Sequence, residues 1–134
     1  MRTDDLGKLL LRLTLGGLMI FHGIAKVIKG PAAIKGMVAA AGFPEQLGYL
    51  VYFGELVAPL LLIVGVLTRP AALVIAINMV VAVLLAHSKQ LFTLNPASGG
   101  WALELQAFFL FTALAIALLG PGSIRFGRRG GFWA

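Results

Sequence analysis

Four long apolar runs, joined by short polar segments, make up most of this 134-residue chain. The runs cover about residues 9–27, 49–67, 71–86 and 101–119. A helix of about 19 residues is roughly 29 Å long, close to the bilayer hydrocarbon core of about 30 Å. Only 12% of the residues are charged, about half the fraction usual in soluble domains. The sequence therefore predicts one domain, residues 1–134, that is all-α: a polytopic membrane protein with a four-transmembrane-helix bundle.

The segment between the first two runs has a different composition. Residues 28–48 contain Pro31, Gly42 and Pro44, which favour turns and helix ends. Between Pro31 and Gly42, the spacing predicts a short helix over about residues 32–41 with one apolar side. Such a helix would lie in the membrane interface or over the end of the bundle. The alternative is a plain connecting loop. After the second run, Thr68-Arg69-Pro70 predicts a tight turn that makes a hairpin of the second and third spans.

Four spans place both termini on the same side of the membrane. Seven basic residues fall on the terminal side and four on the other side. The terminal set is Arg2, Lys8, Arg12, Arg69, Arg125, Arg128 and Arg129, and the opposite set is Lys26, Lys29, Lys35 and Lys89. Since cytoplasmic loops carry an excess of Lys and Arg, the count predicts a multi-pass inner-membrane protein with cytoplasmic termini.

Ionisable groups inside the apolar runs are the candidate functional residues, because they are costly to hold in a membrane. His22 and Lys26 lie four residues apart and share a helix face. Glu55 lies in the second turn of the second span, His87 ends the third, and Glu104 begins the fourth. The topology places all five in the outer leaflet. We therefore expect Glu55 or Glu104 to pair with Lys26 or His22.

Other polar groups have simpler interpretations. Arg12 lies at the opposite end of the first span, and we expect its side chain to extend to the cytoplasmic interface. For Asn78 and Gln106 the expected role is a hydrogen bond between helices, and His87 is typical of an interfacial residue. The Glu–Lys or Glu–His pairs could also only fasten helices together, at about 1 kcal/mol each.

The ordered motifs resemble those of the DoxX family of small four-helix membrane proteins. The similar pieces are LLLRLTLGGLMIFHGIAK, Gly42-Phe43-Pro44, GELVAPLLLIVGVLTRPAA, the run ending at Ala86-His87, GGWALELQAFFL and ALLGPG. The resemblance implies a DoxX-like four-helix bundle over nearly the whole chain. The family name comes from a subunit of a thiosulfate:quinone oxidoreductase, so it also implies a link to quinone or oxidative-stress pathways. All five ionisable candidates lie in the similar motifs.

The first functional hypothesis is a subunit of a membrane oxidoreductase system that binds quinone or another small lipophilic redox substrate. The predicted substrate-binding residues are His22, Lys26, Glu55, His87 and Glu104, with His22 and Glu55 as catalytic candidates. His22 would hydrogen-bond a carbonyl, Glu55 would orient it or relay protons, and Lys26 would stabilise negative charge. Phe108 and Phe111 share the face of Glu104 and could flank a ring, or simply face lipid. The chain has no cysteine, so electrons would come from a partner protein, and no covalently bound cofactor is expected.

Two alternative functions belong to other classes of protein. A non-catalytic membrane anchor, assembly factor or carrier would dock a soluble enzyme through Arg69 and the basic tail. A metal or haem site would use the two His and two Glu residues, but the sequence lacks closely spaced ligand pairs and Lys26 would repel a cation. The expected partner is the lipid bilayer, with a homo-oligomer left open. The net charge of +6 lies mostly beside the apolar runs, so no nucleic-acid binding is expected.

Overall fold

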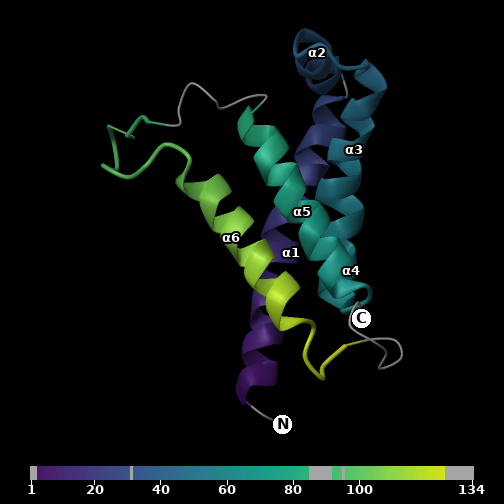
Figure 1. Cartoon of the computed structure of the whole chain (residues 1–134), viewed down its shortest axis with the longest axis vertical. Coiled ribbons are helices and arrows are strands. Elements are labelled where there is room, and N and C mark those ends of the chain that lie inside the picture. Colours follow the sequence, from purple (N-terminus) through teal and green to yellow (C-terminus); the bar gives the residue numbers. More distant parts are fainter. Residues whose placement is uncertain (1–2, 31, 85–91, 95, 126–134) are drawn as a thin grey trace.

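The apolar runs form helices, as the sequence predicts. A computed structural model describes residues 3–30, 32–84, 92–94 and 96–125 (Figure 1). Within these ranges the regular structure is helical, apart from an isolated bridge between Leu94 and Trp101. The helices are α1 (Thr3–Lys29), α2 (Ala32–Ala40), α3 (Tyr49–Tyr52), α4 (Ala58–Val64), α5 (Thr68–Ala82) and α6 (Glu104–Leu119), with a 3-10 turn η1 (Glu45–Gly48) and a π-helical turn η2 (Phe53–Val57). The short helix α2 confirms the helix predicted before Gly42.

Two helical segments of the described chain are long and apolar enough to cross a membrane. One is α1, with 27 residues, and the other is Gln46–Val64, with 19 residues, which joins η1, α3, η2 and α4 end to end. Helices α5 and α6 have 15 and 16 residues. Each is roughly 23 Å long, shorter than the hydrocarbon core. Large apolar side chains such as Phe21, Phe111 and Leu118 are exposed, which is typical of a surface that faces lipid.

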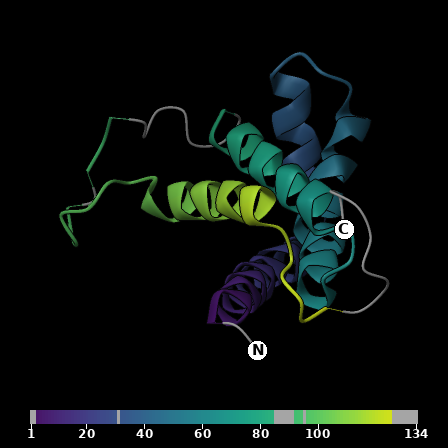
Figure 2. The ribbon, with the colours of Figure 1, turned by 60° about the horizontal axis from the view of Figure 1, so that its bottom comes forward.

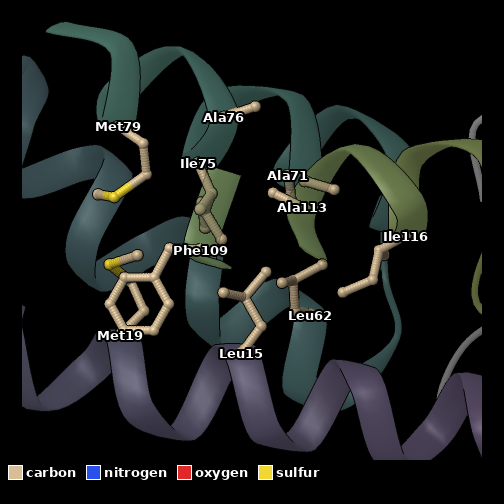
Figure 3. Close-up of a cluster of buried hydrophobic side chains, with 12 residues drawn as sticks. Leu15, Met19, Leu62, Ala71, Ile75, Ala76, Met79, Phe109, Ala113 and Ile116 are labelled. Carbon is tan, nitrogen blue, oxygen red and sulfur yellow. The ribbon is translucent and has the colours of Figure 1, made fainter. Parts of the chain in front are cut away.

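The core lies where α1, α4, α5 and α6 meet (Figures 1 and 2). Helix α5 packs along α6 and α4, and α1 packs against α4, η2 and α6. Figure 3 shows the buried apolar side chains pointing toward one another from these four helices. The cluster comprises Leu15, Met19, Ala58, Leu62, Ala71, Ala72, Ile75, Ala76, Met79, Phe109, Ala113 and Ile116. Its small residues on α5 let neighbouring helices approach closely.

The connection between α4 and α5 differs from the prediction. Thr68-Arg69-Pro70 form the first turn of α5 and not the tight turn itself, because the chain reverses over residues 65–67. Pro70 fits there because the first N–H groups of a helix have no partner within it. Helices α4 and α5 still pack against each other, so the predicted hairpin is confirmed and only its turn is displaced.

Arg12 is buried, so the predicted extension of its side chain to the interface is wrong. Its Nε donates to the carbonyl oxygen of Leu62 at 2.9 Å and its Nη2 to that of Ile63 at 3.1 Å. Its Nη1 donates to the carbonyl oxygens of Pro121 at 2.9 Å and Ile124 at 2.5 Å. The last carbonyls of a helix lack partners within it and carry partial negative charge. Arg12 therefore ties the end of α4 to the chain that follows α6.

Two glycines of α1 lie where other helices approach most closely. A Cβ atom at Gly16 would lie 2.8 Å from Ile63 Cγ1 and 2.9 Å from the Pro59 carbonyl oxygen. A Cβ atom at Gly23 would overlap the backbone carbonyl of Glu55. Gly17, by contrast, has no atom within 4 Å of its Cβ position. Gly16 and Gly23 lie on one face of α1 and allow α4 and η2 to pack closely against it.

Substituting alanine at Gly23 and at Gly17 should have opposite effects. Gly23→Ala should lower the free energy of unfolding by about 2 kcal/mol, because overpacking against a backbone forces the helices apart. Gly17→Ala should be neutral or stabilising by up to about 1 kcal/mol, since alanine favours helix and meets open space. Thermal unfolding in detergent, followed by circular dichroism, measures both. Equal effects of the two substitutions would contradict this packing.

Candidate functional site

An ion pair joins the last turns of α1 to the π-helical turn η2. Lys26 Nζ contacts Glu55 Oε1 as both a hydrogen bond and a salt bridge. Glu55 is only 2% exposed, whereas the Lys26 side chain is 31% exposed. The structure therefore brings together two of the predicted residues from different helices. The buried carboxylate has its counter-charge on a side chain that still reaches the outside of the bundle.

Local backbone geometry explains the position of Glu55. Proline has no N–H, so Pro59 cannot donate to the carbonyl four residues earlier, which is that of Glu55. The helix widens into η2 at this place, as π-turns often do at functional sites. The carbonyl of Glu55 then lies against Gly23 of α1. The absence of a side chain at Gly23 allows η2 to approach α1, and Lys26 lies on the same α1 face one turn further on.

Asn78 extends the polar contact to a third helix. Its Nδ2 donates to Glu55 Oε1 at 3.3 Å, and its side chain is buried. Gly54 makes room for it, because a Cβ atom there would lie 3.0 Å from both Cβ and Cγ of Asn78. The hydrogen bond between helices predicted for Asn78 is confirmed. Glu55 Oε2 is buried and has no hydrogen-bond partner in the described part of the chain.

The other predicted residues do not join this cluster. His22 is exposed, and its ring meets Phe109 edge to face with centroids 5.4 Å apart. Glu104 is exposed at the start of α6, which lies on the far side of the bundle from α3 (Figures 1 and 2). His87 lies outside the described residues. The expected convergence of all four spans is therefore wrong for His22 and Glu104, because α1 turns His22 toward α6 and α6 begins away from η2.

A cavity of about 510 Å³ lies beside the polar cluster. Its walls come from α2, α3, α5 and the segment between α2 and α3, and the lining residues are Val38, Phe43, Leu47, Leu50, Val51, Val74, Ile77, Asn78 and Val81. Of these described residues, Asn78 alone has a polar side chain. The chain of contacts from Lys26 through Glu55 to Asn78 thus ends at the wall of an apolar cavity. Sequence reasoning missed this cavity, although a single amide in an otherwise apolar run was a signal for it.

A second cavity, of about 610 Å³, lies along α6 and includes Glu104, Phe108 and Phe111 in its lining. The structure therefore groups these three residues as their shared helix face predicts, but away from the ion pair. The side-chain oxygen of Gln106 is buried and accepts no hydrogen bond from the described residues. Over the same residues, no group of three or more His, Cys, Asp or Glu side chains is placed to hold a metal ion.

Comparison with known proteins agrees with the motifs. The DoxX family model matches residues 7–88, which include Lys26, Glu55 and Asn78 but not Glu104. An uncharacterized protein of Haemophilus influenzae is 35% identical over 77 residues, covering 58% of this chain and 56% of that protein. The match therefore spans about half the length of that relative. No solved structure matches the chain. Because the family match covers more than half of the sequence, this protein belongs to the DoxX family of membrane proteins.

Proposed function

We propose that the protein binds quinone, or a similarly lipophilic molecule with a carbonyl group, in the 510 Å³ cavity. The observation that carries this proposal is the single amide of Asn78 in an apolar wall, held by the buried carboxylate of Glu55, which is paired with Lys26. Ligand sites are usually apolar clefts of about 300–1,000 Å³ with a few fixed polar groups. The cavity has that size and that composition.

The walls favour a ligand that is dissolved in the membrane. Leu50 on α3 and Ile77 on α5 line the cavity and are 64% and 63% exposed. The cavity therefore reaches the outer surface of the bundle between these helices, where the surroundings are expected to be lipid. A small lipophilic molecule can enter from the side without crossing water.

The polar end of the cavity, at Asn78, favours a ligand whose carbonyl oxygen accepts a hydrogen bond. The amide of Asn78 can donate to a carbonyl oxygen, and its orientation is fixed because it also donates to Glu55. A quinone carbonyl takes up protons as it is reduced, and the Glu55 carboxylate one contact away can relay a proton from the Lys26 ammonium. Electrons would come from a partner oxidoreductase, because the chain has no cysteine for thiol redox chemistry. The protein would then act as one subunit of a membrane oxidoreductase system.

This function fits a four-span arrangement in the inner membrane with cytoplasmic termini. Helices α5 and α6 are short, so a membrane crossing would need flanking residues or a locally thinner bilayer. The count of basic residues supports cytoplasmic termini. The alternative function, docking of a soluble enzyme, would rely on a basic tail of which residues 126–134 lie outside the described residues.

A binding experiment tests the proposal. Purified protein in lipid nanodiscs is titrated with a ubiquinone analogue that carries a decyl side chain, and binding is followed by calorimetry. Asn78→Leu should weaken binding about tenfold through loss of one hydrogen bond to the carbonyl. Ile77→Trp should abolish binding by filling the cavity. Phe108→Leu, in the second cavity, is the matched control and should bind like the original protein. Unchanged binding in Asn78→Leu and Ile77→Trp would exclude this cavity as the site.

A further inference from the structure

The second cavity, of about 610 Å³, follows one face of α6. Its lining includes Glu104 at the start of the helix, Phe108 and Phe111 one and two turns further on, and Ala115 three turns on. Over this distance the helix rises roughly 16 Å. Among the described residues, the two cavities share no lining residue. The volume lies within the range of about 300–1,000 Å³ that is usual for small-molecule sites, so this cavity is a candidate for a second ligand.

Glu104 provides the one charged side chain among the described residues that line this cavity. A Cβ atom at Gly100 would lie 2.5 Å from Glu104 Oε2, so the carboxylate lies against the backbone of Gly100, which also lines the cavity. The carboxylate forms no hydrogen bond or ion pair with the described residues. The positive end of the α6 dipole favours its negative charge but supplies no full counter-charge. One end of the cavity therefore attracts cations.

Aromatic rings lie beside this carboxylate in the lining of the cavity. Phe108 and Phe111 are 67% and 66% exposed, and Trp101 lines the same space. The face of an aromatic ring attracts a cation, and aromatic side chains are the usual binding groups for organic ammonium ions. Since both phenylalanines are exposed on the outside of the bundle, a molecule dissolved in the membrane can reach them from the side.

We propose that this cavity binds a lipophilic ammonium ion, with its charged group at Glu104 and its apolar tail along Phe108 and Phe111. An ionised carboxylate accepts hydrogen bonds and donates none, so it attracts an ammonium group and repels the carbonyl oxygen of a quinone. The site is therefore separate from that of the proposed function and selects a ligand of a different class.

The lining favours an amine that has no phosphate beside its charge. The head group of phosphatidylethanolamine carries a phosphate next to the ammonium group. Among the described residues of the lining, no Lys, Arg or His side chain could bind that phosphate, and Glu104 would repel it. The expected ligand is thus a simple amphiphilic amine and not a phospholipid.

Calorimetry in lipid nanodiscs tests the assignment, with decyltrimethylammonium as the probe and empty nanodiscs to subtract its partition into lipid. Glu104→Gln should weaken binding about fivefold, as expected for the loss of one exposed ion pair. Glu104→Asp keeps the charge and should restore most of the affinity. Phe111→Leu should weaken binding about two- to fivefold through the loss of one ring. Leu105→Ala, on the same helix but outside the lining, is the matched control and should bind like the original protein.

Neutral and phosphate-containing probes test the choice of ligand. Decanol has no cation and should bind about fivefold more weakly than decyltrimethylammonium, and decylphosphocholine should also bind more weakly. Unchanged binding of decyltrimethylammonium in Glu104→Gln, or equal binding of decanol, would overturn the ammonium site. Equal binding of decylphosphocholine would overturn the choice of an amine without phosphate. Asn78→Leu should leave ammonium binding unchanged, so that a failure of quinone binding and a failure of this site are distinguishable.

Discussion

Replacing Arg12 with alanine is expected to lower the free energy of unfolding by about 3–5 kcal/mol. The guanidinium donates to four backbone carbonyls, two at the end of α4 and two after α6. Each buried carbonyl that loses its partner costs about 1–3 kcal/mol unless water replaces it. Arg12 also neutralises the partial negative charge at these helix ends.

Equilibrium unfolding in mixed micelles, followed by circular dichroism, measures the loss. Arg12→Lys should be intermediate, because an ammonium group keeps the charge but cannot reach both chain segments in the planar geometry of guanidinium. Lys8→Ala is the control: Lys8 lies one turn earlier on α1 in a surface pair with Asp4 at 3.8 Å, and its loss should cost less than about 1 kcal/mol. If Arg12→Ala were as mild as Lys8→Ala, the proposed tie between α4 and the chain after α6 would be refuted.

Removing the two partners of the ion pair should have unequal effects. Lys26→Met leaves a buried carboxylate without its cation and should cost about 3 kcal/mol. Glu55→Gln should cost only about 1 kcal/mol, because Lys26 is 31% exposed and can extend toward the headgroups. The glutamine also keeps a side-chain oxygen that can accept from Asn78. The order of the two losses follows from the different burial of the partners.

The double variant distinguishes the stabilisation that the ion pair provides from the cost of leaving one charge buried alone. Lys26→Met with Glu55→Gln should cost about 1–2 kcal/mol, less than the sum of the single changes, because the second substitution removes the stranded charge. Lys29→Met, at the exposed end of the same helix, should have little effect and controls for the loss of a basic residue. Unfolding in the same micelles measures all four proteins. Additive losses would show that Lys26 and Glu55 do not stabilise each other.

The sequence alone was sufficient to predict the helices and the pairing of Glu55 with Lys26. Apolar runs of this length and low charge favour helices, so α1, α4, α5 and α6 follow from composition and spacing. The pairing of Glu55 with Lys26 could also be predicted, since a carboxylate in an apolar helix needs a nearby cation. Gly23 could be predicted to lie at a close contact because it shares a face with Lys26.

The tertiary structure decided what those groups face. Helical periodicity places His22 and Lys26 on one side of α1, but only packing shows that His22 meets Phe109 while Lys26 meets Glu55. The cavity is formed by α2, α3 and α5 together, so no single run carries its signature.

Arg12 and Asn78 show the same division between sequence and structure. The sequence identified each as a polar residue in an apolar run. Their partners, however, are backbone carbonyls up to 112 positions away for Arg12 and a carboxylate 23 positions away for Asn78. The pattern of hydrophobicity specifies which polar residues need hydrogen-bond or ion-pair partners in the membrane. Close contacts at Gly16, Gly23 and Gly54 set the relative placement of the helices. That placement decides which groups become the partners of these polar residues.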